Sequence, residues 1–232
     1  MLAEATTLTL LYTAGLGGRL ELLPRLMTRI RVEKTTIKGP VLLVDLGCSC
    51  EADSWICEAT DGRGMLVAMD AMGYDAFHIG PADALYRKPA TVQQLRQVIQ
   101  TPLAAGPWSA RVTRKRLVIR LAARLDVLLS PVEDADLLLV LQLGNFPRAD
   151  VESDGTVRIL TLDGGWVNSE PLLGRLDVTL TTETPYIALV SQRQLESPDK
   201  LTPDSSIAEI VEFVRSEAQV ATRKRGPIDQ TG

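Results

Sequence analysis

Histidine and aromatic residues are scarce in this chain, which has one histidine among 232 residues and only 4% Phe, Trp and Tyr. A single imidazole excludes a metal centre that is built from several histidine ligands. With so few aromatic side chains, the core must consist mainly of Leu, Val, Ile and Ala, and no binding hot spot stands out. The hydrophobic fraction of 45% is nevertheless that of a globular protein with an ample core.

Long apolar runs and a basic N-terminal region are also missing. The longest apolar run, residues 137–141, is far shorter than the roughly 20 residues that a membrane-spanning helix needs. Residues 1–7 contain an acid and no basic residue, so no signal peptide is expected. The net charge of −4 comprises both signs and gives no reason to expect a nucleic-acid surface. These absences favour a cytoplasmic protein without a membrane span or a nucleic-acid partner.

Three cysteines, Cys48, Cys50 and Cys57, lie within ten residues of one another. An odd, clustered count without an export signal is a poor framework for disulfides, which again favours a reducing compartment. Thiolates also bind zinc or iron–sulfur clusters, and a nearby acid such as Asp45 could complete a ligand set, although the spacing matches no familiar signature. The alternative is that the cysteines are small buried side chains without chemistry. We expect no cofactor, and a Cys-ligated metal is the open alternative.

The order of apolar runs and helical patterns predicts an α/β fold. In the first eighty residues, expected strands at 8–12, 41–45 and 75–79 alternate with expected helices at 20–30 and 64–72, which is typical of a parallel sheet covered by helices. A further helix is expected at 91–99, and a last one at 207–214. The second half otherwise consists of short strands, expected at 109–112, 117–121, 135–141, 157–160, 176–180 and 186–190. We expect one domain over residues 1–220 and a flexible basic tail over 221–232.

Three expected strands run into glycine-containing segments: residues 10–20 (LLYTAGLGGRL), 41–48 (VLLVDLGC) and 68–80 (AMDAMGYDAFHIG). In order, spacing and hydrophobic frame they resemble the first three motifs of the calcineurin-like metallophosphoesterase superfamily, in its 5′-nucleotidase-type branch. Residues 135–144 and 154–180 resemble later parts of that family more loosely. The resemblance implies a sandwich of two mixed β-sheets flanked by helices, shortened in its C-terminal half.

The positions that bind two metal ions in this family carry other residues here. The resemblance places glycines at the first Asp and His, cysteine at the bridging Asp, Pro-Ala-Asp at the Asn-His-Glu triplet, and glutamine at the next His. The one histidine, His78, matches a variable strand position. Two-metal catalysis needs carboxylates and imidazoles to hold two cations about 3.5–4 Å apart, so the sequence predicts that this chemistry is lost. The vacated positions are Gly15, Gly17, Cys48, Pro81, Ala82, Asp83 and Gln142.

The glycine run of Gly15, Gly17 and Gly18, followed by Arg19, is the candidate anion-binding segment. It precedes an expected helix, and glycines at a helix start let backbone N–H groups approach a phosphate, with the helix dipole favouring negative charge. The alternative is that the glycines only form a tight turn where ligands were lost, because the run lacks the Lys-Ser/Thr of a P-loop.

Three functions from different classes are compatible with these residues. The leading hypothesis is a catalytically inactive pseudophosphatase that serves as a binding or scaffold module for a protein partner or a small anionic ligand. The second is a phosphoesterase or nucleotidase with a rebuilt site that uses Cys48, Asp45 and Asp83. The third is a thiol-based metal or redox protein that uses Cys48, Cys50 and Cys57.

Overall fold

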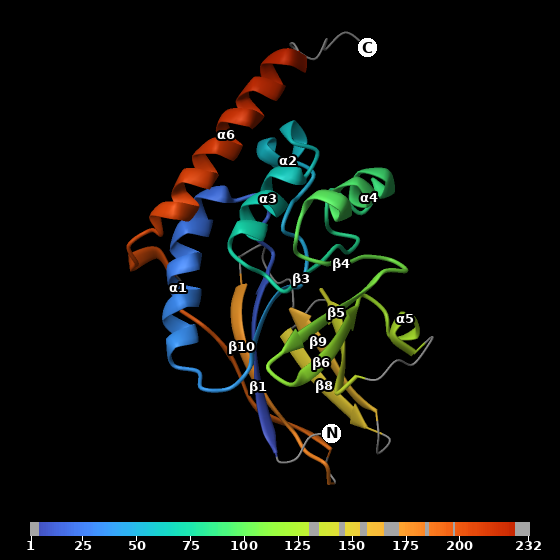
Figure 1. Cartoon of the computed structure of the whole chain (residues 1–232). Helices are drawn as coiled ribbons and strands as arrows, with labels where there is room; N and C mark the ends of the chain where they lie inside the picture. The colour runs from blue at the N-terminus through green and yellow to red at the C-terminus, as the bar shows by residue number, and fades with distance from the viewer. Residues whose placement is uncertain are drawn as a thin grey trace.

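Two mixed β-sheets are stacked against each other, and helices flank them (Figure 1). The computed structural model describes residues 5–129, 135–143, 147–153, 157–164, 172–183, 186–196 and 198–225. The six-stranded sheet has the order β11 (Ile187–Gln194), β10 (Leu172–Leu180), β1 (Thr6–Ala14), β2 (Val41–Asp45), β3 (Ala76–His78) and β4 (Leu103–Ala104). The five-stranded sheet has the order β5 (Ser109–Arg114), β6 (Leu117–Ala122), β7 (Leu137–Gln142), β9 (Arg158–Gly164) and β8 (Pro147–Ser153). The predicted α/β sandwich is confirmed.

Strand direction changes from the centre of each sheet to its edges. The neighbours β1, β2, β3 and β4 are parallel, whereas β10 and β11 are added antiparallel. In the second sheet β6, β7 and β9 are parallel, and the edge strands β5 and β8 are antiparallel. The carboxyl ends of parallel neighbours meet at one edge of a sheet, so the loops after β1, β2 and β3 lie together.

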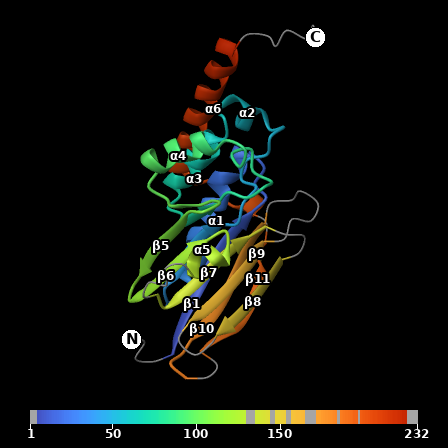
Figure 2. The same cartoon turned by 90° about the vertical axis from the view of Figure 1, so that its right-hand side faces the viewer.

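Most helices pack on the six-stranded sheet, while α5 (Leu125–Leu129) lies over the five-stranded one (Figure 2). A short 3-10 helix, η1 (Leu20–Leu22), leads into α1 (Leu23–Thr35). The C-terminal part of α6 (Ser205–Arg225) extends beyond the sheets (Figures 1 and 2). The other helices are α2 (Trp55–Ala59), α3 (Arg63–Ala71), α4 (Pro89–Val98) and η2 (Pro198–Lys200). No helix in the described part of the chain is long and apolar enough to cross a membrane.

The continuous apolar runs of the first strands are explained by cores on both sides of the sheet. In β1, Leu8, Leu10 and Tyr12 pack between the two sheets, while Leu11 packs under the helices. Successive side chains of a strand point to opposite faces, and both faces here are buried. A strand covered on both sides therefore needs apolar residues at consecutive positions, as the sequence shows.

Every predicted strand and helix overlaps an observed one, but five short or polar elements of the described ranges were not predicted, among them the three-residue η2. The two-residue strand β4 and the five-residue helices α2 and α5 are too short to show a period. The edge strand β8 is largely polar, so it lacks the apolar alternation that marks a strand. The tail expected from residue 221 begins inside α6, which continues to Arg225, and residues 226–232 lie outside the described residues.

Candidate functional site

The loop after β1 is joined directly to the loop after β2 by backbone hydrogen bonds. All three glycines of the run have left-handed backbone conformations, with φ between 61° and 85°, which lets their amides face the neighbouring loop. The amides of Gly15, Gly17 and Gly18 donate to the carbonyl oxygens of Gly47, Cys48 and Ser49 at 3.0, 2.9 and 2.8 Å. The amides that were candidates for anion binding are therefore used within the protein.

Arg19 and the following helix do not complete an anion site either. The Arg19 guanidinium donates to the carbonyl oxygens of Gly15 at 3.1 Å and Leu16 at 3.3 Å. The segment after it is the 3-10 turn η1, and α1 begins only at Leu23. No α-helix N-terminus lies at the glycine run, so the helix dipole adds little there.

Asp83 fixes the loop after β2 through hydrogen bonds to its backbone. Its buried carboxylate accepts hydrogen bonds from the amides of Cys48 at 2.9 Å and Cys50 at 3.3 Å, and from the Ser49 hydroxyl at 3.4 Å. Burial raises the pKa of Asp83 to about 6, while these donors oppose the rise. The resemblance placed Asp83 at a vacated glutamate, and in the structure it orders the neighbouring loop.

Asp45 lies at the end of β2 and has no exposed surface. It accepts hydrogen bonds from the Thr13 hydroxyl at 2.8 Å and from the Gly47 amide at 3.1 Å. Burial, and then the charge of Asp83, raise the pKa of Asp45 well above its usual range. A raised pKa favours the protonated carboxyl group, which is a poorer metal ligand than the carboxylate.

The thiol of Cys48 is unsuited to nucleophilic chemistry. It donates to the Glu51 carboxylate at 3.5 Å and approaches the carbonyl oxygen of Ala82 at 3.9 Å. Burial raises the pKa of the Cys48 thiol far above its usual value, and the charges of Asp83 and Glu51 raise it further. Since the thiolate is the reactive and metal-binding form, Cys48 is held in its inactive form.

Cys50 and Cys57 form a disulfide, which corrects the expectation that the cysteines are reduced and separate. Cys57 lies on α2, and that helix turns its Cys57 side chain back against the loop after β2, with a Cα–Cα distance of 5.7 Å. The expectation was based on an odd cysteine count, but an odd count requires only that one thiol stay free, here Cys48. The disulfide removes two of the four candidate metal ligands.

Reducing this disulfide should lower the free energy of unfolding by about 2.5 kcal/mol, the loop-entropy value for a closed loop of roughly eight residues. Urea denaturation with and without dithiothreitol measures the difference. A Cys48→Ala variant should show the same drop, because Cys48 is outside the disulfide. A variant with both Cys50→Ser and Cys57→Ser should not respond to reductant. Equal stability of the wild-type protein in both conditions would show that the disulfide is absent in solution.

A cavity of about 330 Å³ lies where the ends of β3, β7 and β9 approach each other. Two of the vacated positions line this cavity: Pro81 in the loop after β3, and Gln142 at the end of β7 in the other sheet. His78, Tyr86 and Asp163 line it as well. The tertiary structure thus brings together positions that the resemblance placed in one site.

No protein-family model and no curated protein matches the chain. A 5′-nucleotidase precursor from Thermus thermophilus has a similar structure, with a TM-score of 0.64 at 14% identity, over 92% of this chain and 59% of that one. The calcineurin-like phosphoesterase YfkN from Bacillus subtilis matches with a TM-score of 0.63 at 9% identity, over 94% and 99%. This is a metallophosphoesterase-type fold. Sulfate thiohydrolase SoxB from Thermus thermophilus also matches, with a TM-score of 0.62 at 12% identity, over 92% and 61%. The chain therefore spans less than two thirds of the nucleotidase and SoxB chains.

The two metal ions that a metallophosphoesterase-type fold implies do not fit the residues at these strand ends. Gly15 and Gly17 offer no side chain, and burial raises the pKa of the Asp45 carboxyl and of the Cys48 thiol, which disfavours the charged forms that bind metal ions. Within the described ranges, no cluster of three or more His, Cys, Asp or Glu side chains could hold a metal ion. No hydrolytic step through two metal ions follows from this site.

His78 is the residue that sequence reasoning underrated. It is the last residue of β3, only 6% exposed, and its Nδ1 lies 2.8 Å from the carbonyl oxygen of Leu46. A carbonyl can only accept, so Nδ1 carries the hydrogen and Nε2 keeps a lone pair. Burial lowers the pKa of His78, which favours the neutral ring. A histidine at a strand end that opens on a ligand-binding edge was the available signal.

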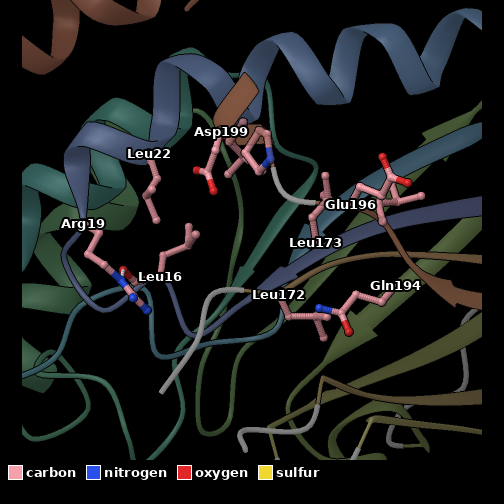
Figure 3. Close-up of a pocket in the computed structure, with 11 residues that line it drawn as sticks. Leu16, Arg19, Leu22, Leu172, Leu173, Gln194, Glu196 and Asp199 are labelled. Carbon is pink, nitrogen blue, oxygen red and sulfur yellow. Dashed lines mark hydrogen bonds between the residues drawn. The ribbon is translucent and has the colours of Figure 1, made fainter. Parts of the chain in front are cut away.

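A second cavity, of about 370 Å³, is lined in part by Leu16 and Arg19 of the loop after β1. Figure 3 shows Leu16 and Leu22 on one side of it and Leu172 and Leu173 on the other. Arg19 also lines this cavity, but two of its hydrogen bonds go to backbone carbonyls of its own loop. Its lining also includes Gln194, Glu196 and Asp199, so polar and acidic side chains lie beside the leucines.

Proposed function

We propose that this protein is a non-hydrolytic, metallophosphoesterase-like binding module. One observation carries the proposal: three backbone hydrogen bonds join the loops after β1 and β2, where side-chain metal ligands would have to converge. To bind metal ions between them, the two loops would have to separate. The glycines of the loop after β1 would still supply no side-chain ligand. The fold is kept while its two-metal chemistry is not.

A rebuilt hydrolytic site is the weaker candidate. It would use Cys48 as nucleophile beside Asp45 and Asp83, yet burial and neighbouring acids raise the pKa of the Cys48 thiol and keep it protonated. Asp83 already accepts three hydrogen bonds from the loop that it orders. A thiol-based metal or redox function is left with a single free thiol, since Cys50 and Cys57 are joined.

The disulfide and the hydrogen-bonded glycine amides change what we expect for the compartment and for the ligand of this module. A cytoplasmic location rests on the sequence alone, and the disulfide opposes it, because disulfides persist mainly in oxidising compartments. A small anion loses its candidate amides, which already donate to carbonyl oxygens. A ligand or protein partner must therefore use another surface of the molecule.

The purified protein should contain no stoichiometric metal and should not hydrolyse phosphoesters. The test is metal analysis, followed by assays of p-nitrophenyl phosphate, bis-p-nitrophenyl phosphate and nucleoside monophosphates with added manganese or nickel. A two-metal phosphoesterase assayed in parallel shows that the conditions support catalysis. Turnover that is lost in a Cys48→Ala variant would replace this proposal with the rebuilt-site enzyme, and metal-dependent turnover that survives in it would equally overturn the proposal.

A further inference from the structure

The cavity beside His78 contains a hydrogen-bond acceptor that has no partner in the described part of the protein. With Nδ1 donating to Leu46, the Nε2 lone pair of a neutral ring is the remaining polar site of His78. Among the described residues, none donates a hydrogen bond to Nε2. The side chain is more than nine-tenths buried and lines the cavity, so only a molecule inside the cavity can use this acceptor.

Gly80 keeps that edge of the ring uncovered. A Cβ atom added to Gly80 would lie 2.9 Å from Cε1 and 3.3 Å from Nε2 of His78. Any larger residue would therefore press on the Cε1–Nε2 edge. Gly80 also lines the cavity, so the absence of its side chain leaves access from the cavity to Nε2.

The charges around the cavity favour a cation over an anion. The negative charge of Asp163 acts on the His78 ring, and Asp83 lies behind Gly47 on the other side of that ring. The one positive residue in the lining that is described, Arg124, is exposed and is neutralised by Asp126 through hydrogen bonds of 2.9 and 2.6 Å. An acceptor nitrogen in an acidic surrounding attracts N–H donors that carry positive charge.

We propose that this cavity binds a small organic cation with N–H donors, of the guanidinium or amidinium class. One N–H donates to Nε2 of His78, the charge faces Asp163, and the half-exposed ring of Tyr86 offers its face to the planar cation. The cavity volume of about 330 Å³ suits a small ligand. The inference rests on the proposed function in one respect, because it requires a cleft without metal ions.

The chain's single histidine makes this proposal directly measurable. In protein labelled with ¹⁵N-histidine, only one imidazole contributes signals. Saturable titration with agmatine or benzamidine should move the Nε2 resonance in the direction that marks a newly accepted hydrogen bond, while the Nδ1–H signal persists. Inorganic phosphate at the same ionic strength should leave both signals in place. A blocked arginine peptide tested beside agmatine distinguishes a protein side chain from a free small cation, and tighter binding of the peptide would overturn the small-molecule assignment.

Two variants test the contact without relying on the labelled ring. His78→Asn keeps a donor for the Leu46 carbonyl but removes Nε2, and it should weaken agmatine binding about tenfold or more, as for loss of a charge-assisted hydrogen bond. Gly80→Ala keeps the histidine and should weaken binding by covering the ring edge. Gly106→Ala is the control for added volume in the lining, since a Cβ there meets nothing within 4 Å, although its φ of +54° makes alanine conformationally unfavourable at this position. Circular dichroism confirms that each variant is folded.

Different experimental results would overturn the cation site and the proposed function. An unchanged Nε2 signal, or agmatine affinity that is equal in folded His78→Asn and wild type, would overturn the cation site. A response to phosphate alone would also overturn it. Metal-dependent phosphoester hydrolysis would instead overturn the proposed function, whatever the cation titration shows.

Discussion

Replacing Gly18 with alanine should lower the free energy of unfolding by about 4 kcal/mol. Gly18 has φ +85°, a conformation that disfavours any Cβ atom. The added Cβ would lie 2.2 Å from Oγ and 2.7 Å from Cβ of Ser54, and 2.8 Å from Sγ of Cys57. The Ser54 hydroxyl can rotate away. The Ser54 Cβ cannot move without its backbone, however, and the Cys57 sulfur is held by the disulfide. The loop must therefore move, which breaks its pairing with the loop after β2.

Gly73→Ala is the matched control for this experiment. Gly73 also has a positive φ, +72°, but a Cβ there meets nothing within 4 Å. Gly73→Ala should lower the free energy of unfolding by only about 1–2 kcal/mol, the cost of placing a Cβ atom in a left-handed backbone conformation. Urea denaturation followed by circular dichroism gives both values. Equal costs at Gly18 and Gly73 would show that the glycine run is not packed against α2 as described.

Asp83 alone should make the protein about 2 kcal/mol less stable at pH 7 than at pH 4. Burial raises the pKa of Asp83 to about 6 in the folded state, from an ordinary value of 3.8. Between these two values the folded state binds more protons than the unfolded state, so the free energy of unfolding falls as pH rises. The contribution is complete below the unfolded pKa and is lost as pH passes through the folded pKa. Most buried ion-paired carboxylates have the opposite sign.

Asp83→Asn isolates this contribution from the rest of the chain. Both oxygens of Asp83 accept backbone N–H groups, so the amide NH₂ of asparagine must face a donor, which gives a destabilisation that does not change with pH. The pH-dependent part is the wild-type minus variant difference in unfolding free energy, which should fall from pH 4 to 7. In Asp126→Asn the trend should be reversed and small, because the exposed Asp126 has its pKa lowered by a hydrogen bond from Arg124. A difference that stays flat would mean that Asp83 is ionised throughout.

Several features of the fold were determined by local sequence. Residues 41–45 were predicted as a strand covered on both faces, and β2 has these bounds, because four consecutive apolar residues at 41–44 suit burial on two sides. The 3.6-residue spacing of Ile207, Val211 and Val214 identified α6, but its end could not be placed, since the last turns are polar and extend beyond the core. The polar edge strand β8 was missed for the same reason: it buries too little to leave a pattern.

From the sequence alone we predicted that the two-metal ligand set of the resembling family is missing, because glycine has no side chain and one histidine cannot fill several positions. The contacts that these residues make instead follow from the tertiary structure. The pairing of Gly15 with Gly47 and the convergence of His78 with Gln142 and Asp163 join segments that are far apart in the sequence. Composition and motif spacing do not give the spatial distances between such segments, because those distances are set by how the strands align in the two sheets. The absence of the expected ligand residues could thus be predicted from the chain, whereas the closed glycine loop and the open edge of His78 could not.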